Sequence, residues 1–231
     1  MSRSWKEVWD ARRLDSHKGS ELEQLMAAGG LETGPGGVTE DAWRDFVERA
    51  AETLDIGPGT RVFEVGCGAG AFLYPLYENG YVVGGLDQSA ALVSYAAQAM
   101  PDGRWTIGDA SALDPGEPWD VVVACGMFGY FPDLDYARGV LARMAAKATH
   151  AIAILDVPDL ERRAEMPAAR PPSPGETDDE ARRAGLDHLF YGRGWMLRAL
   201  AEIGMRAVRI EDQRIDGCRH APFRINVFAR A

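Results

Sequence analysis

Apolar runs bounded by turn residues alternate along most of this chain with segments of helical periodicity. Two of the runs, residues 120–125 and 150–155, are almost continuously apolar, as expected of strands buried on both faces of a parallel sheet. The pattern predicts strand 60–65, helix 70–79, strand 81–86, helix 89–99, strand 104–108, strand 119–125, helix 133–147 and strand 149–156. This alternation is typical of an α/β, doubly wound core with helices on both faces of the sheet.

The segment before this core is predicted to be helical. Helices are expected over residues 4–14, 20–28 and 39–54. Thr39 is the expected N-cap of the third helix, because its hydroxyl can accept a hydrogen bond from a free N–H group of the first turn. Residues 1–55 are therefore expected to form an N-terminal helical cap on a single domain that spans residues 1–231.

The segment after the core returns to a regular pattern only after an irregular stretch. Residues 159–185 are rich in proline and charge. They predict a flexible insertion or lid, with a solvated loop of no special role as the alternative. A helix over 192–203 and strands near 205–213 and 223–229 are expected to follow.

A turn with alternating glycines follows the first predicted strand, within the sequence RVFEVGCGAGAF. The glycines are Gly66, Gly68 and Gly70. Glycine lets the backbone adopt unusual dihedral angles and approach a ligand, and the helix that follows offers free N–H groups to negative charge. The turn thus predicts a nucleoside-binding site. The dinucleotide pattern G-x-G-x-x-G/A also fits, through Ala71, but Glu64 stands where a dinucleotide loop is normally apolar.

Two further acids lie at the ends of the next predicted strands. Asp87 follows strand 81–86, where a carboxylate can accept both hydroxyls of an unphosphorylated ribose. Asp109, with the small residue Ala110 after it, follows strand 104–108. Glu64 with its glycines, Asp87, and Asp109 with Ala110, in this order, resemble the motifs of class I S-adenosylmethionine-dependent methyltransferases.

The resemblance implies a Rossmann-like sheet of seven strands in the order 3-2-1-4-5-7-6, with the last strand antiparallel. It implies S-adenosylmethionine as the cofactor and in-line methyl transfer to an oxygen or nitrogen of a small molecule. Glu64 and the glycine turn would meet the amino-acid end of the cofactor, Asp87 the ribose, and Asp109 with Ala110 the adenine. The residues assigned to the cofactor are Glu64, Gly66, Cys67, Gly68, Gly70, Asp87, Gln88, Asp109, Ala110 and Cys125.

A narrower resemblance extends over most of the chain. The segments that carry it include Trp5-x-x-x-Trp9, Phe128-Gly-Tyr-Phe-Pro, His188-Leu-Phe-Tyr and Phe223-Arg-Ile-Asn-Val. They are similar to bacterial small-molecule methyltransferases of polysaccharide and antibiotic biosynthesis. That group often has Gly-Asn-Ser near residues 219–221, where this chain has Arg-His-Ala, so the acceptor is not carried over. Trp5 and Trp9 share a helix face that would close over the cofactor, join the core or form a dimer contact.

Five residues are candidates for the acceptor side of the site. His188 is a candidate base because imidazole titrates in a range suited to proton transfer, and the alternative is a buried histidine bonded to backbone. Tyr130, after the fourth core strand, would orient the acceptor through its hydroxyl or simply pack. Asp156 at a strand end, His220 in a loop and Arg224 on the last strand are candidate substrate-binding residues, with a helix cap or an exposed sheet face as alternatives.

Composition narrows the range of partners. The chain has 25 Lys and Arg against 35 Asp and Glu, a formal net charge of −10, and neither nucleic acid nor an anionic membrane gains from an acidic surface. The apolar run around 121–131 is too short to cross a bilayer. A small-molecule acceptor, a cytoplasmic location and a monomer or homodimer are therefore expected.

The cysteines and the missing motifs limit the chemistry. Cys67, Cys125 and Cys218 are odd in number and have no C-x-x-C spacing, so neither a disulfide framework nor a metal site is predicted. A nicotinamide-dependent oxidoreductase or epimerase would use the same glycine turn, but no tyrosine has a lysine four residues on. A cofactor-binding regulator without catalysis is the third hypothesis.

Overall fold

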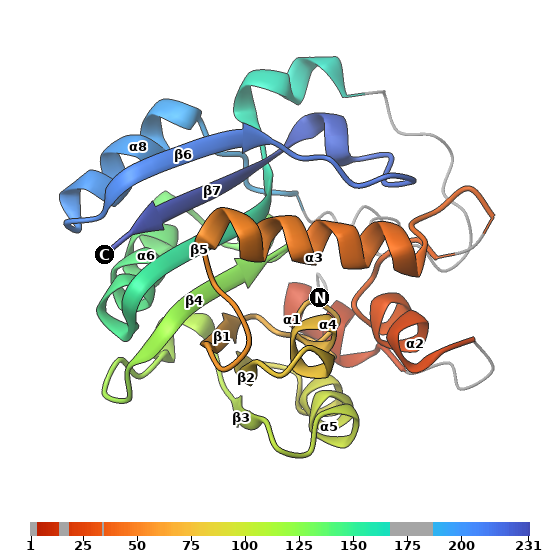
Figure 1. Cartoon of the computed structure of the whole chain (residues 1–231). Helices are drawn as coiled ribbons and strands as arrows, with labels where there is room; N and C mark the ends of the chain where they lie inside the picture. The colour runs from red at the N-terminus through yellow and green to blue at the C-terminus, as the bar shows by residue number, and fades with distance from the viewer. Residues whose placement is uncertain (1–3, 14–18, 34, 167–186) are drawn as a thin grey trace.

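Seven strands form one sheet in the order β3-β2-β1-β4-β5-β7-β6 in the computed structural model, which describes residues 4–13, 19–33, 35–166 and 187–231. The strands are β1 (Arg61–Val65), β2 (Val82–Asp87), β3 (Arg104–Ile107), β4 (Trp119–Cys125), β5 (Ala148–Pro158), β6 (Arg206–Asp212) and β7 (Arg224–Arg230). Figure 1 shows them from β3 at the bottom to β6 at the top. The four strand pairs from β3 to β5, which the sequence predicted as a parallel core, are parallel, and β7 is antiparallel to both of its neighbours. The predicted fold class and strand order are confirmed.

Helices cover both faces of this sheet. They are α1 (Trp5–Asp10), α2 (Glu21–Ala28), α3 (Glu40–Leu54), α4 (Leu73–Glu78), α5 (Ala90–Ala99), α6 (Leu134–Lys147) and α8 (Arg193–Glu202). Successive residues of β4 enter different cores: Val121 and Val123 pack with α2 to α5, whereas Val122 and Ala124 pack with α6 and α8. Because successive side chains of a strand point to opposite faces, an uninterrupted apolar strand needs a helical layer on each side.

Side-chain caps explain where several helices begin. Thr39 accepts a hydrogen bond from the N–H group of Ala42, as predicted for the start of α3. Ser89 and Asp133 cap α5 and α6 in the same way. The helix predicted from residue 70 begins three residues later, because the glycine turn continues to Phe72 before α4 starts.

The beginning of the predicted insertion is ordered. Residues 160–165 form a short 3₁₀ helix after Asp159, whose side chain is fully buried. Arg193 of α8 donates to Asp159 Oδ2 through Nε (3.1 Å) and Nη2 (2.8 Å), and Asp159 also forms a β-bridge with Tyr191. This ion pair ties residues 159–166 to the segment that begins after the insertion. Residues 167–185 lie outside the described residues, so the flexible insertion or lid stays a prediction.

Two glycines allow a matched test of packing on this sheet. A Cβ atom at Gly84 of β2 would lie 2.7 Å from Trp119 Cη2 and 2.8 Å from the carbonyl oxygen of Arg104, whereas one at Gly139 of α6 would have no neighbour within 4 Å. We expect Gly84→Ala to lower the free energy of unfolding by about 1–3 kcal/mol through overpacking. Gly139→Ala should raise it by about 0.5–1 kcal/mol. Urea denaturation measures both, and equal effects would contradict the packing described for β2.

Candidate active site

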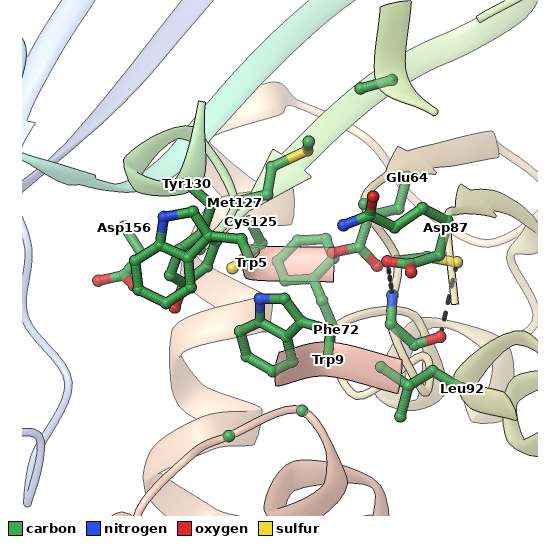
Figure 2. Close-up of a pocket in the computed structure, with 18 of the residues that line it drawn as sticks. Trp5, Trp9, Glu64, Phe72, Asp87, Leu92, Cys125, Met127, Tyr130 and Asp156 are labelled. Carbon is green, nitrogen blue, oxygen red and sulfur yellow. Dashed lines mark hydrogen bonds between the residues drawn. The ribbon is translucent and has the colours of Figure 1, made fainter. Parts of the chain in front are cut away.

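A cavity of about 450 Å³ lies at the carboxyl ends of the parallel strands. Asp87, Cys125 and Asp156, from the ends of β2, β4 and β5, all line it. In Figure 2, Glu64 and Asp87 lie at one end, Asp156 and Tyr130 lie at the other, and Cys125 lies between them. Parallel strands bring their carboxyl ends to one edge of a sheet, so acids far apart in the sequence meet there.

The three glycines of the turn serve different purposes. All three have positive φ angles, +72° at Gly66, +50° at Gly68 and +86° at Gly70, a region that other residues rarely adopt. Gly66 and Gly68 line the cavity. Gly70 does not line it, because a Cβ atom there would lie 2.4 Å from Met100 Cε, beyond the end of α5. Its absent side chain therefore allows the turn to pack on α5, and the predicted cofactor contact at this position is not seen in the cavity lining.

Asp87 organises the turn while it faces the cavity. Its Oδ2 accepts from the N–H group of Gly68 (2.9 Å) and its Oδ1 from that of Ser89 (2.8 Å). Burial raises the pKa of Asp87, and these two hydrogen bonds act in the opposite direction. A carboxylate has about four acceptor sites, so each oxygen keeps capacity for one more donor. Two adjacent ribose hydroxyls would supply those donors.

Glu64 is the most unusual side chain of the site. It is only 2% exposed, and its Oε2 is buried without a hydrogen-bond partner among the described residues. Burial, followed by repulsion from Asp87, raises the pKa of this carboxyl group well above its ordinary value. An unpaired buried polar atom is costly unless a ligand completes it. An oxygen in this position suits a ligand with N–H donors, such as the amino group of S-adenosylmethionine, so the residues present fit that cofactor.

Asp109 and Ala110 line the same end of the cavity, together with Gln88. Asp109 Oδ1 accepts from the N–H group of Ser111 (2.9 Å), from Ser111 Oγ (2.5 Å) and from the hydroxyl of Tyr136 (2.6 Å). Burial alone would raise the pKa of Asp109, but the hydrogen bonds from Ser111 and Tyr136 outweigh it and lower the pKa. The carboxylate is thus held ionised and fixed in orientation, with Oδ2 left for a ligand.

Tyr136 is a residue of the site that the sequence analysis missed. It lines the cavity from the first turn of α6, where the N-cap Asp133 accepts from its N–H group (2.8 Å). Burial and then Asp109 raise the pKa of the phenol to about 12, so it stays a hydrogen-bond donor. The capping signal at Asp133 was visible in the sequence, but the contact with Asp109, 27 residues away, depends on how α6 packs beside the 3₁₀ helix Ala110–Ala112.

Asp156 dominates the opposite end of the cavity. It has a left-handed backbone (φ +57°) at a register shift of β5, and its N–H group donates to Asn226 Oδ1 (3.0 Å). Its Oδ1 accepts from Nε2 of Gln213 (2.6 Å), which is also buried and lines the cavity. Arg224 lies behind this group and outside the cavity lining, with Nη1 3.3 Å from the backbone oxygen of Asp156 and Nε 4.0 Å from Oδ1. Arg224 thus contacts Asp156, and its predicted role in substrate binding stays a prediction.

An aromatic group closes the cavity near Asp156. The rings of Trp5 and Trp9 on α1 lie 4.6 Å and 5.3 Å from that of Tyr130, centroid to centroid. All three line the cavity, so this face of α1 borders the site, and closure over the cofactor stays a prediction. His188 does not line the cavity. Its ring packs 5.1 Å from that of Trp5 and 5.4 Å from that of Tyr130, and both of these rings line the cavity.

The remaining predicted residues fall into two groups. Cys67 and Cys125 line the cavity as free thiols, and the pKa of Cys125 is raised by burial and then by the charges of Glu64 and Asp156. This perturbation by both carboxylates agrees with the position of Cys125 between the two ends. His220 precedes the 3₁₀ helix Ala221–Phe223 and is not part of the cavity lining.

The part of the chain that the structure describes has neither a metal-binding cluster nor a membrane-spanning helix. In residues 4–13, 19–33, 35–166 and 187–231, no group of three or more His, Cys, Asp or Glu is arranged to hold a metal ion. Among the helices that the structure describes, none combines the length and the apolar character needed to span a membrane.

Seven-stranded sheets of this order, with an antiparallel strand inserted beside β5, are the frame of class I S-adenosylmethionine-dependent methyltransferases. The cavity at the ends of β1, β2 and β3 is lined by carboxylates and a glycine turn that fit this cofactor. Residues 62–150 match the family described as a methyltransferase domain.

Curated relatives and solved structures agree with this assignment. The chain is 34% identical over 111 residues to nocamycin O-methyltransferase of Saccharothrix syringae, covering 44% of this chain and 40% of that protein. It is 31% identical over 108 residues to dTDP-4-amino-2,3,4,6-tetradeoxy-D-glucose N,N-dimethyltransferase of Saccharopolyspora spinosa, covering 44% and 43%. In both matches the chain spans less than half the length of the relative.

The fold similarity extends over nearly the whole chain. The structure of CalS10 with bound S-adenosylmethionine, an amino pentose methyltransferase of Micromonospora echinaspora, aligns with a TM-score of 0.66 and 15% identity, covering 94% of this chain and 99% of that one. A methyltransferase of Clostridium acetobutylicum aligns with a TM-score of 0.63 and 12% identity, covering 84% and 92%. At these identities the likeness establishes the fold.

Proposed function

We propose that the protein transfers a methyl group from S-adenosylmethionine to an oxygen or nitrogen atom of a small molecule. The observation that carries this proposal is the buried, unpartnered Oε2 of Glu64 in the same cavity as Asp87 and the glycine turn. These positions suit a ligand that has an amino group for Glu64 and a ribose for Asp87. The end of β3 leaves room for its adenine. The predicted cofactor residues other than Gly70 all line that cavity.

Each part of the site has a task in this reaction. Glu64 would hold the amino group of the cofactor, Asp87 its ribose hydroxyls, and Asp109 with Ala110 its adenine. When bound, S-adenosylmethionine would supply an electrophilic methyl group to the acceptor's lone pair, its sulfur would keep the electrons of the broken carbon–sulfur bond, and the acceptor's proton would pass to solvent. Trp5 and Trp9 would exclude water, and Tyr130 would align the acceptor, with His188 as a positioning residue behind it.

The acceptor is proposed to be an intermediate of natural-product biosynthesis. Two named relatives, the nocamycin and the amino sugar methyltransferases, act on small molecules of this kind, as does CalS10. A cavity of about 450 Å³ must hold both the cofactor and the reacting end of the acceptor, which suits a small molecule better than a macromolecule. The cytoplasmic location, the monomer or homodimer and the absence of nucleic acid from the reaction stay predictions.

The dinucleotide hypothesis loses support from the fold. Dinucleotide-binding sheets have the order 3-2-1-4-5-6, whereas this sheet places β7 between β5 and β6. The hypothesis of a non-catalytic regulator depends on the acceptor side, where Asp156, Gln213 and Tyr130 keep functional groups in the cavity lining.

Calorimetry can separate these functions. We expect S-adenosylmethionine and its demethylated product to bind, and NAD to show no binding, because Glu64 favours an amino group and the turn lacks the dinucleotide frame. Methyl transfer would then be followed as release of the demethylated product with a panel of small acceptors. Binding of NAD alone would overturn the proposal, and cofactor binding without turnover on any acceptor would favour the regulator.

A further inference from the structure

Gln213 carries the second buried oxygen of the cavity that lacks a donor. Its side chain is 4% exposed, it lines the cavity, and its Oε1 has no hydrogen-bond partner among the described residues. Unlike Glu64, it stands on the acceptor side, next to Asp156. A buried acceptor in this position indicates a ligand that donates a hydrogen bond.

The orientation of the Gln213 amide is fixed by its neighbour. Asp156 Oδ1 lies 2.6 Å from Nε2, and an ionised carboxylate can only accept, so the amide nitrogen must point to Asp156 and the amide oxygen must point away. The same contact uses Oδ1 of Asp156. Oδ2 lies beside Gly126, another residue of the cavity lining, at 3.4 Å from the position of a Cβ atom there.

The acceptor end of the cavity thus presents hydrogen-bond acceptors, Gln213 Oε1 and Asp156 Oδ2, to a ligand that can donate. Arg224 is the cation nearest to Asp156, but its Nη1 donates to the backbone oxygen, its Nε is 4.0 Å from Oδ1, and it lies outside the cavity lining. Among the described residues that line the cavity, Lys6 is the one that is basic, whereas four are acids: Glu64, Asp87, Asp109 and Asp156. An anionic acceptor would meet like charge at this end, whereas a cationic or neutral donor would not.

We propose that the methyl acceptor is an amine, whose N–H groups donate to Gln213 Oε1 and Asp156 Oδ2. This inference rests on the proposed function and narrows its acceptor class. A single hydroxyl has one hydrogen to donate and would leave one of the two oxygens without a donor, whereas a neutral primary amine donates two and keeps its lone pair for the methyl group. An ammonium ion would first release a proton to solvent, and the methylated nitrogen would release its excess proton in the same way. The faces of Trp5, Trp9 and Tyr130 at the same end add favourable sites for a cationic or apolar amine.

Matched probes test the amine directly. The protein saturated with S-adenosylhomocysteine would be titrated with cyclohexylamine, cyclohexanol and cis-1,2-cyclohexanediol, and with 2-phenylethylamine and 2-phenylethanol. Methylation of each probe would be measured in parallel with S-adenosylmethionine. We expect at least one amine to bind, or to be methylated, at least about tenfold better than its alcohol. Preference for an alcohol or the diol, equal binding, or no binding of any amine would overturn the proposal.

Two variants assign the preference to the proposed oxygens. Asp156→Asn keeps a residue type that tolerates positive φ, and Gln213→Leu removes the orphan oxygen with little change of size. Since a hydrogen bond to a charged group contributes about 10- to 150-fold in affinity, each variant should reduce the preference for the amine by about that factor. Affinity for S-adenosylhomocysteine should stay within about twofold. Asp41→Asn, an exposed site on α3, is the control and should change neither.

The outcomes distinguish this inference from the function on which it rests. If the wild-type protein fails to bind S-adenosylmethionine, the proposed function fails. If it binds the cofactor and shows no amine preference, or if both variants keep the wild-type preference, only the amine proposal fails. Should either variant fold poorly in a urea titration, the probe panel on the wild-type protein still decides the acceptor class.

Discussion

Replacing Asp87 with alanine should weaken the binding of S-adenosylmethionine by about 10²- to 10⁴-fold. Two charge-assisted hydrogen bonds to ribose hydroxyls, at about 1.5–3 kcal/mol each, would be lost. The variant would also release the N–H groups of Gly68 and Ser89, which the carboxylate now holds at 2.9 Å and 2.8 Å, and so loosen the glycine turn. Isothermal titration calorimetry with S-adenosylmethionine and S-adenosylhomocysteine measures the effect on both ligands.

Asp45→Ala is the matched control for this experiment. It removes an exposed carboxylate from α3 and should leave the affinity for the cofactor unchanged. Urea denaturation of both variants without ligand separates loss of binding from loss of folding. An Asp87→Ala protein that is folded and binds the cofactor as tightly as the wild type would remove the ribose assignment.

Replacing Glu64 with glutamine should make the unliganded protein more stable and the cofactor bind less tightly. The unpaired buried carboxylate costs about 1–3 kcal/mol, which the neutral amide avoids. The affinity for the cofactor should fall, because in the complex the amino group of the cofactor would be buried without its counter-ion. Breaking such a pair costs about 3–5 kcal/mol, or about 10²- to 10⁴-fold in affinity.

The stability difference should depend on pH in one direction. The folded-state pKa of Glu64 is raised, so the folded protein holds a proton that the unfolded chain releases near its ordinary pKa of 4.5. The wild type should therefore lose stability relative to Glu64→Gln as pH rises through the folded-state pKa, and the two should converge as pH falls toward about 4.5. Urea denaturation between pH 5 and 8 measures this, with Glu48→Gln on α3 as the exposed control. Parallel curves for the wild type and Glu64→Gln would contradict the buried state of this carboxyl group.

The sheet and the cofactor side of the site were largely predictable from the sequence. The strands are short apolar runs between residues that favour turns. Thr39 predicts the start of α3 because its capping hydrogen bond joins residues only three apart. Asp87 and Asp109 were placed at the site because each ends a strand of a parallel sheet, where strand ends share one edge. These inferences need only neighbouring residues and the topology of the class.

The acceptor side could not be predicted in the same way, because its contacts join distant parts of the chain. Gln213 reaches Asp156 across 57 residues, through the position of β6 beyond β7, and nothing in the surrounding sequence marks it. The sequence indicated His188 as a candidate because of its chemistry. In the structure its ring packs against Trp5 and Tyr130, which line the cavity, whereas His188 itself does not. Gly70 belonged to the motif, yet Met100 explains its glycine.

The cavity is built from two sources that differ in their arrangement along the chain. Its cofactor half comes from one contiguous stretch, from Glu64 to Ala110, which lies inside the region matched by the family model. Its acceptor half joins Trp5, Trp9, Asp156 and Gln213 from outside that region to Tyr130 within it. Substitutions in the flanking segments are therefore expected to alter the acceptor end of the cavity while the stretch from Glu64 to Ala110 keeps its structure.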